Sequence, residues 1–175
     1  HTEEYREQVG LLESLQGLEK HQAVQGEIDS LIDGLFTTAR GVNRKYNNES
    51  HKLDTEMVVI DRLGARYDDN LAEQEEINKA LADENLTLEE KKKLKEDLVD
   101  LQEKESNLES LIASSLSENI QRLEDLEGFN EIIDNADLYN ADKKGLEKVA
   151  ISEETLTLFE ELREKYGFLF EGAVE

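Results

Sequence analysis

The side chains that most often do chemistry are scarce in this sequence. It holds three histidines, His1, His21 and His51, and no cysteine. The absence of cysteine excludes disulfides, thiolate metal sites and cysteine nucleophiles. A di-iron helical bundle needs Glu-x-x-His on two helices, whereas Leu18 and Asn48 stand three residues before the two internal histidines. We therefore interpret His21 and His51 as solvent-facing helix residues.

Carboxylates are abundant, but none is marked as a site. The chain has 43 Asp plus Glu against 20 Lys plus Arg, so close acidic pairs arise by chance. The stretch 134–145 offers oxygen ligands of the kind Ca²⁺ takes, yet Tyr139 and Gly145 stand where a calcium loop has Gly and Glu. Phosphate-binding glycine loops and serine nucleophile elbows are missing as well. We expect no metal, no cofactor and no enzymatic activity.

The charge balance limits the partners. The net charge is −23, and neither half is basic: residues 1–85 carry 19 acids and 9 bases, and residues 86–175 carry 24 acids and 11 bases. Two local basic clusters, within 40–52 and 91–95, are flanked by acids and are interpreted as solvated helix faces. Direct nucleic-acid binding is not expected, because it needs a basic face. No apolar run is long enough for a membrane-spanning segment.

Long helices must position whatever site exists. The sequence has no proline, and its apolar residues recur every three or four positions. We predict an all-α fold: an elongated antiparallel three-helix bundle or coiled coil with a smaller helical C-terminal end. The long helices are expected at 3–46, about 54–82 and about 88–127, with a break at 47–50. Thr87 and Glu90 match a capping box that starts the third helix.

The apolar stripes predict a core seam along these helices. Its members repeat with three- and four-residue steps typical of coiled coils; they are Ile28, Leu31, Leu35, Met57, Ile60, Leu71, Leu94, Leu98, Leu101, Leu108 and Ile112. Five glycines in the first helix, spaced seven to nine residues apart, are either tolerated or mark a close contact between helices. The same seams can close within one chain or between chains, so self-association stays open.

The C-terminal end has a different character. We divide the chain into a long-helix stalk, 1–127, and a short-helix cap, 128–175, packed on the stalk as part of a single domain. Within the cap we expect a short helix at 129–136, a loop through 140–145 and a helix at 153–166 that Ser152 caps. Its aromatic-rich residues pack as a core or form a partner-binding patch; they are Phe159, Tyr166, Phe168, Leu169 and Phe170.

These features favour a non-enzymatic helical scaffold or protein–protein interaction module. One alternative is an extracytoplasmic helical domain of a bacterial or phage surface, secretion or sensory protein. Another is an acidic nucleic-acid mimic, because residues 109–142 hold nine acids and a single base, Arg122. The expected partner is a protein or a second copy of the chain. The compartment stays open: a soluble cytoplasmic or an extracytoplasmic part of a larger protein fits equally.

Overall fold

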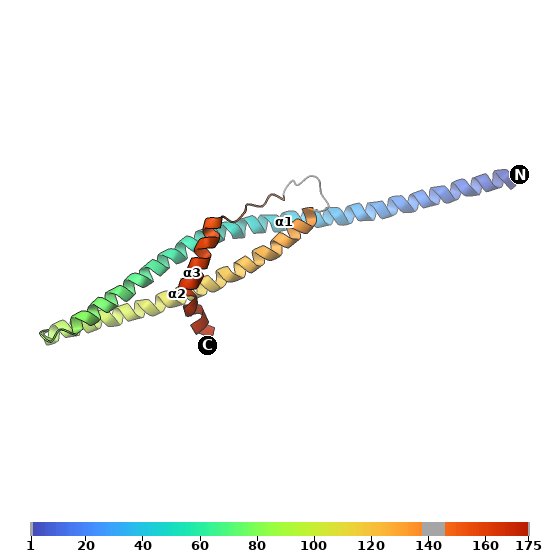
Figure 1. Ribbon diagram of the computed structural model, residues 1–175. Helices are drawn as coiled ribbons and strands as arrows, with labels where there is room; N and C mark the ends of the chain where they lie inside the picture. Colours follow the sequence, from blue (N-terminus) through green and yellow to red (C-terminus); the bar gives the residue numbers. More distant parts are fainter. Residues whose placement is uncertain (1, 138–145, 175) are drawn as a thin grey trace. The chain divides into compact units, whose positions relative to one another are not determined.

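The protein is all-α, as predicted, and forms a helical bundle. The structure is a computed structural model that describes residues 2–137 and 146–174. The described residues form three helices: α1, Thr2–Leu81; α2, Leu88–Asp137; and α3, Glu153–Val174 (Figure 1). The loop expected through 140–145, and most of the acidic stretch considered above for Ca²⁺, lie outside the described residues.

The predicted caps of α2 and α3 are both present, whereas the starts expected at about 54 and at 129 lie inside α1 and α2. At the start of α2, the backbone N–H of Glu90 donates to the Thr87 hydroxyl over 3.1 Å, and the N–H of Thr87 donates to the Glu90 carboxylate over 3.4 Å. This reciprocal pair is the predicted capping box. At the start of α3, the N–H of Thr155 donates to the Ser152 hydroxyl over 3.1 Å. Both caps satisfy N–H groups that have no partner inside the helix.

Two of the predicted helix ends, at residue 46 and at residue 127, are wrong, whereas the break between 82 and 88 is present. Helix α1 continues through 47–50, and α2 continues through Gly128 to Asp137. A glycine or asparagine costs at most about 1 kcal/mol in a helix interior, which tertiary contacts readily outweigh. Here Tyr46, Ser50 and Leu53 are buried, and the N–H of Val149 donates to the Asn47 side chain over 2.9 Å. No proline follows either site to force an end.

The contacts of the chain group into two units: His1–Lys45 with Phe129–Glu147, and Tyr46–Gly128 with Lys148–Glu175. We call them unit 1 and unit 2. In unit 1 the buried residues are few; among those described they are Ala39, Asn43, Ile133, Ala136 and Leu146. The Asn43 amide donates to the backbone oxygen of Glu147 over 3.1 Å, which links α1 to the segment before α3.

Within one chain, the predicted core seam does not extend to the N-terminal side of unit 1. Leu31 is 74% exposed and Ile28 is 43% exposed, while Leu35 is half-buried. The physical reason is the continuity of α1. Without a turn at 47–50, residues 3–46 are part of α1 and do not form a separate helix. Leu31 therefore has no covering element among the described residues of unit 1.

Within unit 2, α1 and α2 form an antiparallel pair. Four hydrogen bonds show this direction, because the residue numbers rise along α1 while they fall along α2; the bonded pairs are Glu49–Arg122, Glu56–Asn119, Tyr67–Glu109 and Asn70–Leu101. Met57, Ile60 and Ile112 of the predicted seam lie in its core. Leu94, Leu98, Leu101 and Leu108 are half-buried.

Leu71 does not belong to the seam of unit 2, because it is 38% exposed. Asn70, its neighbour, is buried instead and donates to the backbone oxygen of Leu101 over 3.0 Å. Gln74 follows one turn later and donates to Asn70 and to Glu105. An α-helix has 3.6 residues per turn, so a strict seven-residue repeat drifts off the contact face. The interface here follows Tyr67, Asn70 and Gln74.

A buried guanidinium fixes the register of the α1–α2 pair. Arg122 is 8% exposed; its Nε donates to Glu49 over 2.8 Å, and its Nη1 donates to Glu56 over 3.0 Å and to Asn119. Asn119 also donates to Glu56 over 2.6 Å. The hydrogen bond from Arg122 lowers the pKa of Glu49 below its ordinary value and outweighs burial, which raises it. Sliding the helices past each other would leave the buried Arg122 guanidinium without its carboxylate partners, which is costly.

Replacing Arg122→Met should lower the free energy of unfolding by about 2–4 kcal/mol at pH 7, because it removes the buried cation and leaves Glu49 and Glu56 without their hydrogen-bond donor. A lowered folded-state pKa of Glu49 stabilises the fold above the unfolded value of 4.5, and this stability is lost as the pH falls through the folded-state value. The difference between wild type and variant should therefore shrink on acidification. Urea unfolding from pH 7 to pH 3 measures it.

The matched control is Lys52→Met. Lys52 also pairs with Glu49, at 3.5 Å, but its side chain is 60% exposed. An exposed pair contributes about 0–1 kcal/mol, so this variant should unfold nearly as the wild type does. Equal losses in the two variants would contradict the importance of the buried guanidinium.

Helix α3 crosses the α1–α2 pair within unit 2 (Figure 1). Its contacts follow α1 in the same chain direction, from Asp54 near the start of α3 to Asp68 at Tyr166. The Thr155 hydroxyl donates to Asp54 over 2.6 Å near the start of α3. One face of α3 is buried through Phe159, Leu162 and Tyr166. These three residues recur at three- and four-residue steps and so share one side of the helix.

Gly64 of α1 lies directly against Tyr166 of α3. A Cβ at Gly64 would lie 2.5–2.6 Å from the hydroxyl and ring atoms of Tyr166. The ring is held on other sides: its hydroxyl donates to Asp68 over 3.1 Å, and it meets Tyr67 edge-on with centroids 6.1 Å apart. Because the ring cannot retreat cheaply, this position requires glycine.

Replacing Gly64→Ala should therefore destabilise the protein by about 1–2 kcal/mol, because the overpacking cost exceeds the gain of about 1 kcal/mol in helix propensity. Gly41→Ala is the matched control, since a Cβ there meets nothing within 4 Å. That variant should be neutral or more stable by up to about 1 kcal/mol. Thermal unfolding followed by circular dichroism compares them, and equal shifts in the same direction would contradict the assignment.

Candidate functional site

The aromatic residues of the C-terminal end divide into two sets. Phe159 and Tyr166, predicted as partner-binding residues, are buried, so this part of the prediction is wrong. Phe168, in contrast, is 57% exposed, and Leu169 and Phe170 are half-buried. The division follows from α3 continuing past Gly167 to Val174. The continued helix holds Phe168 away from the face that carries Phe159 and Tyr166.

Phe168 and Phe170 line a groove between α2 and α3, within unit 2. Leu116 and Ile120 of α2 line its opposite side, and the groove holds about 490 Å³. Gly167 also lines it, and a Cβ at Gly167 would meet nothing within 4 Å. The absence of a side chain there leaves the groove open. Its apolar walls therefore come from two helices, α2 and α3.

The edge of the groove is charged. Glu160 and Glu164, one turn apart on α3, line it together with Arg163. Both glutamates are exposed, and neither forms an ion pair within the residues that the structure describes. Two carboxylates against one guanidinium make the edge negative on a chain whose net charge is −23. The groove thus combines aromatic lining residues, Phe168 and Phe170, with a negatively charged edge that attracts cations.

Two further features stabilise the helix that carries the groove. Lys165 pairs with Asp68 of α1 at 2.6 Å and lies 5.2 Å from the centre of the Tyr166 ring. Burial and the hydrogen bond to Asp68 raise the pKa of Tyr166, although Lys165 acts in the opposite direction. Burial and Glu109 raise the pKa of Tyr67 to about 12. Both phenols therefore stay protonated near neutral pH and act as hydrogen-bond donors at this contact.

The described residues do not contain a metal centre: no three His, Asp or Glu side chains among them are grouped to hold an ion. His21 and His51 are exposed on α1. None of the three described helices is long and apolar enough to cross a bilayer.

Sequence reasoning missed three elements of unit 2. The sequence does mark Arg122, because it is the only basic residue between 109 and 142. It does not mark the groove, since Leu116 and Ile120 resemble the other apolar residues of the helix and only the position of α3 makes them groove residues. Gly64 had only the general signal that a glycine within a seam permits close approach. The five glycines before residue 46 carry the same signal, yet a Cβ at any of them meets nothing within 4 Å.

The two sets of aromatics should respond differently to truncation. Phe159→Ala should lower the free energy of unfolding by about 3–5 kcal/mol, because it empties a buried site. Phe168→Ala should change it by no more than about 0.5 kcal/mol, as an exposed residue does. Chemical denaturation of the two variants compares them. A large loss of stability in Phe168→Ala would place Phe168 in the core and remove it from the groove surface.

Comparison with protein families, with curated proteins and with solved structures gives no match to this chain.

Proposed function

We propose that this chain is a non-enzymatic helical interaction module whose groove between α2 and α3 binds an apolar protein segment flanked by basic residues. The observation that carries this proposal is Phe168, which is 57% exposed beside Phe170 in a groove with an acidic edge. Large apolar side chains that stay exposed together in a concave surface are typical of contact sites. Aromatic side chains in such sites contribute much of the binding free energy.

The placement of α3 supports a binding role. The buried face of α3 is packed against α1 through Tyr166 and Gly64. The opposite face is therefore already ordered before a ligand binds, and binding loses little conformational entropy there. Pre-organised sites of this kind retain more of the contact free energy as affinity. The remaining exposed area of Phe168 corresponds to about 1–2 kcal/mol on burial.

The charge of the site favours basic flanks on the ligand. Glu160 and Glu164 lie at the edge, where exposed carboxylates improve the association rate and select partners by charge. The same negative field makes nucleic acid an unsuitable ligand, since phosphate binding needs Lys and Arg on the protein. A scaffold role is consistent with this, because the groove and the buried seam residues Met57, Ile60 and Ile112 belong to the same unit.

A fluorescent amphipathic peptide of leucine and lysine tests the proposal, with a leucine–glutamate peptide of the same pattern as its counterpart. Fluorescence anisotropy should show tighter binding of the lysine peptide. Phe168→Ala should weaken that binding by about tenfold, the equivalent of about 1.4 kcal/mol. This substitution leaves the charge unchanged, so it separates groove binding from general attraction to an acidic protein.

The matched control is Val149→Ala, which truncates another exposed apolar residue of unit 2 that does not line the groove. Its affinity for the lysine peptide should equal that of the wild type. Equal binding by wild type, Phe168→Ala and Val149→Ala would mean that the peptide follows charge alone, and the groove would lose its assigned role.

A further inference from the structure

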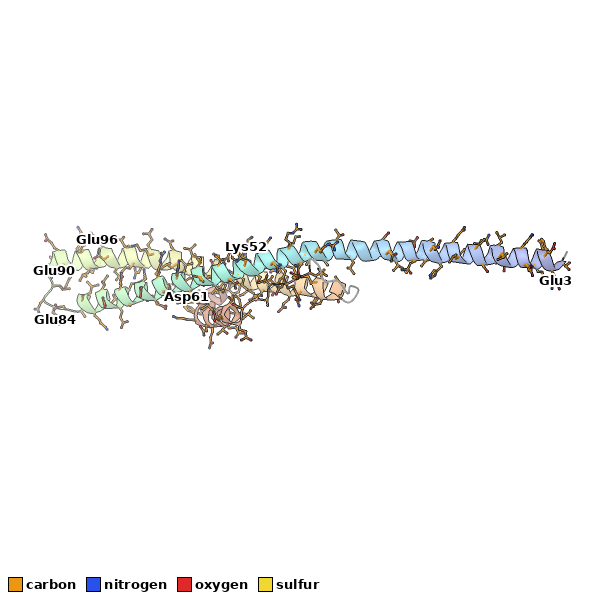
Figure 2. All side chains as sticks on the ribbon, turned by 90° about the horizontal axis from the view of Figure 1, so that it is seen from above. Glu3, Lys52, Asp61, Glu84, Glu90 and Glu96 are labelled. Atoms are coloured by element: carbon orange, nitrogen blue, oxygen red, sulfur yellow. The ribbon has the colours of Figure 1, made fainter. Side chains whose placement is uncertain are left out.

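A basic and apolar patch lies on the first turns of α2, in unit 2. Leu88, Lys92, Lys95 and Val99 follow one another by four, three and four residues and so share one face of the helix. Leu88 is 86% exposed and Val99 is 61% exposed. Lys91 borders this face, as do Glu96 and Asp100. Figure 2 shows Glu90 and Glu96 on this stretch of α2, close to the loop at Glu84. We call it the lysine patch.

The lysines of this patch are available for an outside partner. Lys91, Lys92 and Lys95 form no ion pair with any residue that the structure describes. Lys93, between them, differs: it pairs with Asp97 over 3.2 Å. A partner that contacts the patch can therefore pair with these lysines without breaking an existing ion pair, and it covers Leu88 and Val99 as well.

The lysine patch is complementary to the groove between α2 and α3. The patch joins exposed aliphatic side chains to cations, and the groove joins Phe168 and Phe170 to the carboxylates of Glu160 and Glu164. Lys92 and Lys95 stand about one helical turn apart, as do the two glutamates, so both charge pairs fit helices laid side by side. The lysine patch is therefore an apolar segment with basic residues, which is the type of ligand proposed for the groove.

We propose that the lysine patch of one copy docks into the α2–α3 groove of a second copy, an inference that rests on the binding role of the groove proposed above. The two surfaces are different, so the contact is head-to-tail and each copy retains one free surface of each kind. Such contacts continue into rings or open chains of subunits. The overall charge of −23 opposes close approach, but at physiological salt charges beyond about 8 Å are largely screened.

Charge exchange between the two surfaces provides the test, with sedimentation velocity of the full chain from about 1 to about 300 μM. The patch variant is Lys92→Glu with Lys95→Glu, and the groove variant is Glu160→Lys with Glu164→Lys. Each variant alone should associate at least about tenfold more weakly than the wild type, because like charges then face each other. An equal mixture of the two should associate again, since opposite charges then face each other at every contact.

Two controls separate specific docking from net charge. All four substitutions in one chain keep the net charge at −23 and should restore association. Glu76→Lys with Glu103→Lys changes the net charge as the groove variant does, at exposed positions outside both surfaces, and should associate as the wild type does. Circular dichroism verifies that every variant is folded.

The outcomes distinguish this inference from the proposed function. A wild type that stays monomeric throughout, while Phe168 still governs binding of the lysine peptide, overturns self-docking and leaves the groove with a different protein partner. Association that survives both the patch and the groove variants runs through another surface and also overturns self-docking. Lysine-peptide binding that ignores Phe168 overturns the groove itself.

Discussion

The arrangement of unit 2 depends on the contact between the Tyr166 ring and the backbone of α1 at Gly64. A side chain at residue 64 would occupy the space of the ring. The glycine costs about 1 kcal/mol of helix propensity, and the close approach it permits lets one aromatic ring pack on Tyr67 and donate to Asp68. With Tyr166 in place, α3 presents Phe168 and Glu164 on its other side. The groove is thus a consequence of a missing side chain on a different helix.

Polar contacts set which residues of α1 and α2 lie opposite each other. Arg122 joins Glu49 and Glu56 near one end of the paired region, and Asn70 donates to the backbone of Leu101 near the other. Apolar residues such as Met57 and Ile112 supply most of the driving force by burial. Leucine-rich stripes tolerate slippage by a heptad, whereas a buried guanidinium has acceptors in one register only. The apolar seam therefore stabilises the pair, and the polar contacts specify its register.

The sequence predicts the helical class and the two capped helix starts well, because those signals are local. Thr87 and Glu90 cap α2 through groups three residues apart, and Ser152 caps α3 in the same manner. Helix ends were less predictable, because a glycine such as Gly128 stops a helix only when nothing else stabilises it. The exposure of Leu31 and the burial of Phe159 depend on which distant segments lie alongside them. A periodic stripe identifies an apolar face and leaves open what covers it.

A double-mutant cycle between Gly64→Ala and Tyr166→Ala measures how strongly the Tyr166 ring and the glycine on α1 depend on each other. If the ring alone excludes a side chain at residue 64, the alanine should destabilise the wild type but stabilise the Tyr166→Ala background by up to about 1 kcal/mol, its ordinary helix propensity. Chemical denaturation of the four proteins gives the coupling free energy between residues 64 and 166, which should exceed about 1 kcal/mol. The same change in both backgrounds would mean that Gly64 and Tyr166 act independently, and would contradict the placement of α3 described here.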